Sequence, residues 1–182
     1  MTPPARPRVL VWGLALIAAL VGPAWMDDPA DARIRLTIRV ALACYFLAVA
    51  MLLLSATQRS IRLVWTLGLV AYLVHVAVAF HLAFGWSHAD AVSHTRERSG
   101  VGEGIYASHL FTLVWTLDVC CWWLAPESHA NRRAWVGWTL HGFMAFMVFE
   151  GTVVYETGFI RWAGVVAFSV LGTLVAWRKS WG

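Results

Sequence analysis

Residues 61–86, IRLVWTLGLVAYLVHVAVAFHLAFGW, form an apolar stretch that carries one basic side chain, Arg62, and no acidic one. A run of about 20 apolar residues is long enough to cross a bilayer as a helix. A helix also satisfies its own backbone hydrogen bonds, which a lipid environment requires. The stretch therefore predicts a transmembrane helix, and it sets the fold class expected for the rest of the chain.

Five further apolar runs lie on either side of this stretch, and most of the connections between them are short and polar. The six predicted spans lie near residues 9–25, 34–55, 61–86, 105–125, 135–155 and 160–177. The chain is 60% hydrophobic and 13% charged, whereas soluble domains average about 45–50% and about 25%. We expect an all-α polytopic membrane protein in which residues 1–182 form one bundle of six transmembrane helices.

The connection after residue 86 is the only long one, and it covers residues 87–104. Ser87 and Asp90 have the spacing of a capping box, which marks the start of a helix. Asp90, His94 and Glu97 then recur at the spacing of one helix face. Three glycines follow, the first of them Gly100. The sequence predicts a short interfacial helix within this loop.

The charge pattern indicates a membrane surface as the partner. The net charge is +4, and the basic residues lie mostly at the ends of apolar runs, with no basic and aromatic motif for nucleic acid. With six spans, eight of the 14 Lys and Arg residues lie on the side of the termini and six on the other. This bias predicts cytoplasmic termini and an external 87–104 loop. We expect a protein of the bacterial inner membrane, with the lipid bilayer and other membrane subunits as partners.

Ionisable side chains inside predicted spans point to function, because burying them in lipid is costly. His81, His109 and Glu150 lie five, four and five residues from the outer ends of their predicted helices. At 1.5 Å per residue they share one layer, about 6–8 Å below the outer face. Imidazole and carboxylate groups bind zinc, copper or iron, so this layer predicts a metal site, with His94 and Asp90 as further ligands. The alternative is three separate polar residues that bond to water or backbone near the interface.

The loop contains a second pattern, Asp90-x3-His94 followed by His109. Over these twenty residues the pattern resembles the Asp-x3-His…His copper motif in one subunit of membrane copper monooxygenases, such as particulate methane monooxygenase. The resemblance implies copper as the metal. The interval between His94 and His109 is longer than in that family, so the sequence departs from the pattern at its third ligand.

Asp118 and His141 lie deeper, thirteen and fourteen residues from the outer ends of their helices. They predict a buried Asp–His hydrogen bond that orients a ligand, relays protons or locks two helices together. Asp118 follows His109 by nine residues, and Glu150 follows His141 by nine. Nine residues are two and a half helical turns, so the two layers face opposite sides of their helices, unless a helix irregularity near Gly142 or Gly151 rotates one of them.

Three interpretations of function remain open at this point. The first is a metal-dependent membrane enzyme that oxidises or hydrolyses a membrane-soluble substrate. The second is a non-catalytic structural or accessory subunit of a larger membrane complex. The third is a protein that holds a single b-type haem between two histidines of similar depth, such as His81 and His109. The sequence contains no phosphate-binding loop, serine-hydrolase elbow, zinc-protease motif or dinucleotide fingerprint.

Overall fold

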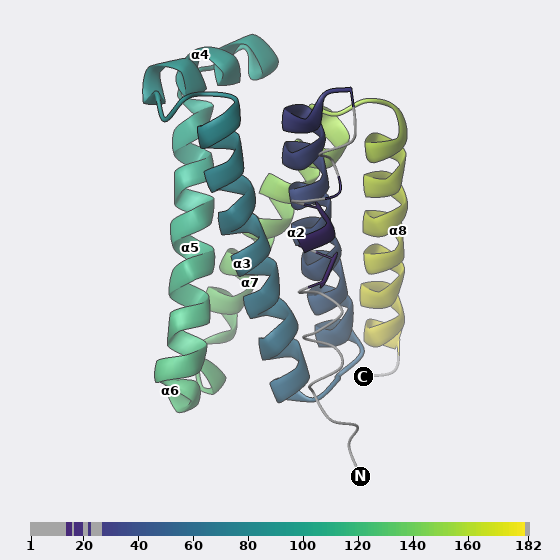
Figure 1. The fold of residues 1–182 in the computed structure, drawn as a ribbon. Helices are drawn as coiled ribbons and strands as arrows, with labels where there is room; N and C mark the ends of the chain where they lie inside the picture. Colours follow the sequence, from purple (N-terminus) through teal and green to yellow (C-terminus); the bar gives the residue numbers. More distant parts are fainter. Residues whose placement is uncertain (1–13, 16, 20–21, 23–26, 181–182) are drawn as a thin grey trace. The chain divides into compact units, whose positions relative to one another are not determined.

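The computed structural model describes residues 14–15, 17–19, 22 and 27–180 (Figure 1). Every element that it assigns in this part of the chain from residue 27 onward is helical. The elements are α2 (Pro29–Leu53), α3 (Gln58–Leu82), α4 (His88–Ser99), α5 (Gly104–Leu124), α6 (Pro126–Ala130), α7 (Ala134–Phe149), the π-helix η2 (Glu150–Val154) and α8 (Gly158–Ser180).

Four helices in the described part are long and apolar enough to cross a membrane, namely α2, α3, α5 and α8 up to Arg178. They coincide with the predicted spans 34–55, 61–86, 105–125 and 160–177. The prediction of an all-helical fold with apolar helices of membrane-spanning length is therefore confirmed for the described residues. The prediction of six transmembrane helices is not confirmed.

The two remaining predicted spans have different outcomes. The first, residues 9–25, falls mostly outside the described residues. The fifth, residues 135–155, folds as α7, which has 16 residues, and continues directly into the five-residue π-helix η2. In η2 the Tyr155 amide donates to the Glu150 carbonyl at 3.0 Å, which is a bond five residues back. Hydropathy cannot distinguish this register from the usual four-residue one, because the run is apolar whichever of its faces a register turns inward.

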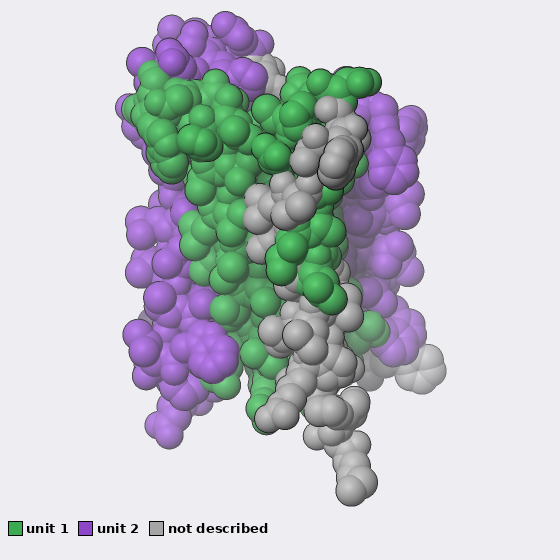
Figure 2. Space-filling model, viewed as in Figure 1, with its two compact units in different colours: residues 1–88 green, residues 89–182 purple. Residues whose placement is uncertain are grey.

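The described chain separates into two compact units, residues 1–88 and residues 89–182 (Figure 2). In the first unit, α2 and α3 pack along each other as a helical hairpin. The buried residues of α2 recur every three or four positions, as one helix face requires; they are Thr37, Ala41, Cys44, Tyr45 and Ala48. Small side chains let two apolar helices approach closely, and the Tyr45 ring lies 5.8 Å from the Trp65 ring of α3.

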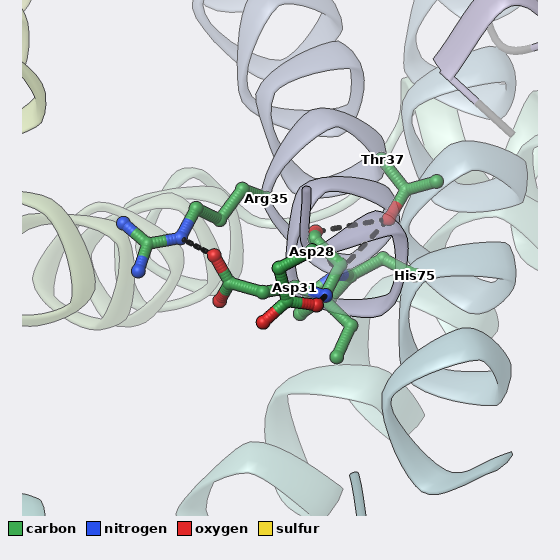
Figure 3. Close-up of polar contacts among 6 residues, drawn as sticks. Asp28, Asp31, Arg35, Thr37 and His75 are labelled. Atoms are coloured by element: carbon green, nitrogen blue, oxygen red, sulfur yellow. Dashed lines mark hydrogen bonds and ion pairs between the residues drawn. The ribbon is translucent and has the colours of Figure 1, made fainter. Parts of the chain in front are cut away.

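Polar contacts fix the beginning of this hairpin (Figure 3). The Asp28 carboxylate accepts the Asp31 amide at 3.0 Å and so caps α2. The Thr37 hydroxyl is buried and donates to the Arg33 carbonyl at 2.7 Å. His75 Nδ1 of α3 lies 3.0 Å from the Ile34 carbonyl oxygen. A carbonyl only accepts, so Nδ1 carries the hydrogen, and the ring ties α3 to α2 without leaving that donor unpaired in lipid.

In the second unit, the helix α4 occupies the long connection and folds back onto the start of α5. Ala91 of α4 is buried. A Cβ atom on Gly102 would lie 3.0 Å from Val92 Cγ1, and one on Gly104 would lie 3.3 Å from Thr95 Cγ2. Two glycines before α5 therefore allow the chain to pass closely against α4.

The π-helix η2 packs against α8. A Cβ atom on Gly164 of α8 would lie 2.9 Å from Thr152 Oγ1 of η2, so only glycine fits this contact without a shift. The Arg161 guanidinium donates to the Val153 carbonyl at 2.9 Å and to the Val154 carbonyl at 3.2 Å. Carbonyls at the end of a helix lack intrahelical hydrogen-bond donors, and the Arg161 guanidinium provides donors for these two carbonyls.

The contact between Gly164 and Thr152 makes a direct test of this packing possible. The Gly164→Ala variant should lose about 1–3 kcal/mol of stability, because the added methyl group overpacks a buried contact. Its thermal unfolding in detergent should therefore begin at a lower temperature than that of the wild type. Gly172→Ala is the matched control on the same helix, since a Cβ there meets nothing within 4 Å. Equal behaviour of the two variants would contradict the packing described for η2.

Candidate functional site

The most deeply buried charged group in the described residues is Asp118, and it lies in a polar cluster built from α5, α6 and α7. The local sequence explains this scaffold. Pro126 disfavours a helical conformation at Ala125, and Ala125 indeed adopts φ −137° and ψ 62°, where α5 ends. Pro126 then occupies the first turn of α6, where its missing amide hydrogen costs nothing. The turn after α6 brings Arg132 back toward α5.

Asp118 Oδ1 accepts two hydrogen bonds from this turn. Arg132 Nη1 donates to it at 2.6 Å, and His129 Nε2 lies 3.3 Å away. The Asp118 side chain is 2% exposed and that of Arg132 is 23% exposed. The pair is therefore a largely buried ion pair, reinforced by an imidazole.

Two further side chains complete the cluster. Arg132 Nη2 lies 3.4 Å from His141 Nε2 of α7. The His129 ring stacks on the Trp122 ring of α5, with centroids 4.3 Å apart and planes at 9°. A Cβ atom on Gly137 would lie 3.6 Å from Arg132 Nε, which is an ordinary van der Waals distance, so this position of α7 borders the guanidinium.

The donor and acceptor chemistry fixes the protonation of both rings. A carboxylate oxygen accepts, so His129 Nε2 carries a hydrogen and donates to Asp118. A guanidinium only donates, so His141 Nε2 accepts from Arg132 with its lone pair. His141 is therefore neutral in this arrangement. The cluster holds one negative and one positive charge, which balance each other.

The surroundings of His129 also favour its neutral form. Burial lowers the pKa of His129 below its ordinary value of 6.5, and the charge of Arg132 lowers it further. The Asp118 carboxylate opposes both effects but is the smaller influence. The His129 imidazole therefore becomes protonated only in acidic solution. Its added positive charge then upsets the balance between Asp118 and Arg132.

The sequence predicted Asp118 and His141 as a buried polar pair joined by a direct hydrogen bond. The structure brings both residues into the same cluster, and the Arg132 guanidinium bonds to each of them. On the sequence, Arg132 and His129 fall in the short polar connection between the fourth and fifth predicted spans, and they were not assigned to the site. A signal was available, because Asp118 lies six residues before the end of α5 and His141 seven residues after the start of α7. Counting depth from that connection puts both about 10 Å below it, within reach of an arginine beside it.

The predicted metal ligands lie on several elements. His81 is exposed near the end of α3, and His109 is exposed on α5. Asp90 and His94 are exposed on α4, and Glu150 is the first residue of η2. The described residues contain no group of three or more His, Cys, Asp or Glu side chains that could hold a metal ion. His81 belongs to the first compact unit and the other four to the second.

No protein-family model, curated protein or solved structure matches the chain.

The ion pair predicts a large difference between two adjacent arginines. Arg132→Gln should destabilise the protein by about 3–5 kcal/mol, because it leaves the buried Asp118 carboxylate without its counterion. Arg133→Gln should change stability by no more than about 0.5 kcal/mol, since that side chain is exposed. Thermal unfolding in detergent measures both. Adding Asp118→Asn to Arg132→Gln should recover part of the loss, and a double variant as unstable as Arg132→Gln alone would argue against the pairing.

The lowered pKa of His129 predicts that acid weakens the cluster. The unfolded chain binds a proton at this residue near pH 6.5 and the folded chain does so only at lower pH, so the stabilisation is complete above about pH 6.5 and is lost as the pH falls. The melting temperature should drop between about pH 7.5 and about pH 5.5, and His129→Gln should reduce that drop. His88→Gln, at an exposed position of α4, is the control. An unchanged pH dependence in His129→Gln would contradict this assignment.

Proposed function

We propose that this chain is a non-catalytic accessory subunit of a larger membrane complex. The observation that carries the proposal is the pairing inside the buried cluster. Arg132 and His129 both bond to Asp118, and Arg132 also bonds to His141. These bonds connect α5, α6 and α7 and balance the buried charge. A cluster whose side chains bond to one another is suited to holding helices together. It is less suited to binding and releasing a substrate.

The helix α8 supports a role in assembly. Only 11% of its apolar window is buried inside the chain. Its exposed residues include a row of small side chains at helical spacing, which are Ser169, Gly172, Thr173 and Ala176. Small residues on a lipid-facing helix favour close packing against another helix. A partner subunit would find on α8 a surface that its own transmembrane helix can approach.

The topology that accompanies this function has six spans with both termini in the cytoplasm of a bacterial cell. In it, α7 and η2 together form the fifth crossing, since their 21 continuous residues measure about 30 Å at α-helical rise. Residues 9–25, which the sequence predicts as the first crossing, lie mostly outside the described residues. The inner membrane is the location that the Lys and Arg distribution favours.

A transition-metal centre is the second candidate function, with copper, zinc or iron held by His81, His109 and Glu150, and with His94 and Asp90 beside them. One observation favours it. Glu150 is the residue at which the regular helix gives way to η2, and π-helical turns occur frequently at functional sites. This chemistry would serve an oxidation or hydrolysis on a membrane-soluble substrate.

One preparation separates the two candidates. The protein is extracted from native membranes in a mild detergent, and its particle mass and bound metal are measured. The accessory role predicts a particle of defined composition much heavier than the 20.3 kDa chain with its micelle. It also predicts that Gly172→Leu releases the chain, because the larger side chain fills the small-residue row of α8. Ala163→Leu should not, because Ala163 is exposed two and a half turns before Gly172 and so lies on the opposite side of that helix.

Two results would overturn the accessory role. A chain that migrates alone and holds stoichiometric metal, lost in His109→Ala, would support the metal centre instead. A chain that migrates alone and holds neither metal nor haem would contradict both candidates.

A further inference from the structure

An open groove in the first compact unit lies between the described residues of the 14–19 segment and α2. Its cavity volume is about 340 Å³. Its walls are small or aliphatic, with Ala15, Ala18 and Ala19 on one side and Leu36 and Val40 on the other. One charged side chain, Arg39 of α2, also lines it.

Arg39 lies at the boundary between the charged and the apolar parts of α2. It lies ten residues after Pro29, and the residues from Val40 to Leu53 carry no charge. Arg39 is therefore the last charge that α2 carries before its apolar half begins. One turn earlier, the Arg35 guanidinium pairs with the Asp31 carboxylate (Figure 3). Arg39 is exposed, so its guanidinium can reach the polar surface of a membrane while its aliphatic stem stays among apolar groups.

We propose that this groove binds an anionic phospholipid, with one acyl chain against the alanine side chains and the phosphate on Arg39. Charge complementarity supports the choice of ligand, because a guanidinium matches a phosphate with two parallel hydrogen bonds. Basic pockets between transmembrane helices are a recognised form of anionic headgroup site. The groove has the two parts that such a lipid needs, an apolar wall and a single cation beside it.

The shape of the wall supports an acyl chain over a bulkier occupant. Alanine side chains project little from a helix, so a flexible hydrocarbon chain can lie close along the helix and make many van der Waals contacts. Zwitterionic and anionic phospholipids both carry a phosphate and can carry the same acyl chains, but the cation of a zwitterionic headgroup offsets the phosphate charge that Arg39 would bind. The site therefore discriminates by headgroup charge.

The test uses the full chain in neutral detergent with defined lipids. Retention of phosphatidylglycerol and phosphatidylcholine with the same acyl chains is measured by native mass spectrometry. The wild type should retain phosphatidylglycerol preferentially. Arg39→Gln should bind it at least about tenfold more weakly, which is the effect of losing a charged hydrogen bond. Arg59→Gln, an exposed arginine outside the groove, should bind it as the wild type does.

A second variant tests the acyl wall separately. Ala18→Phe keeps Arg39 and fills part of the groove, so it should weaken binding of both lipids. Equal retention of phosphatidylglycerol by the wild type and Arg39→Gln would overturn the proposal. So would full competition by inorganic phosphate with no effect of Ala18→Phe, because that result would indicate an ion site without an acyl chain.

Discussion

A polar group inside a lipid bilayer must find its hydrogen-bond partner within the protein, and this constraint accounts for most features of the chain. It requires the backbone to be helical. It explains why His75 donates to the Ile34 carbonyl and why Thr37 bonds within its own helix. It explains why Arg161 covers the carbonyls at the end of η2. The cluster around Asp118 meets the same requirement with charged groups, where failure would cost most.

The fold class was accessible from the sequence because hydropathy records this constraint directly. Four apolar runs became membrane-length helices. The run 135–155 did not become one regular helix, and its hydropathy does not indicate that, although Gly151 lies where the regular helix ends. The change at Glu150 is a change of hydrogen-bond register, held by Gly164 and Arg161 of the next helix. Contacts with a neighbouring element accompany this change, and the hydropathy of the run does not encode such contacts.

Two of the four polar residues of the candidate site could be predicted from the sequence. Asp118 and His141 stand out because ionisable residues are rare within apolar runs. Their partners His129 and Arg132 do not, because polar residues are ordinary in a connection and only the fold of α6 turns them inward. The metal layer stays a prediction for the opposite reason. Depth counting gave His81, His109 and Glu150 one height, but height along a helix does not fix the direction of a side chain or the placement of one unit against another.

The π-helix η2 also constrains how the length of this chain can vary. Exposed loop tips usually accept an inserted residue. Here one residue fewer between Phe149 and Tyr155 would restore a regular α-helix and rotate the segment after it by about 100°. Arg161 would then turn away from the Val153 carbonyl, and Gly164 from Thr152. The segment from η2 to the start of α8 therefore has a fixed length, in which the number of residues matters as much as their identity.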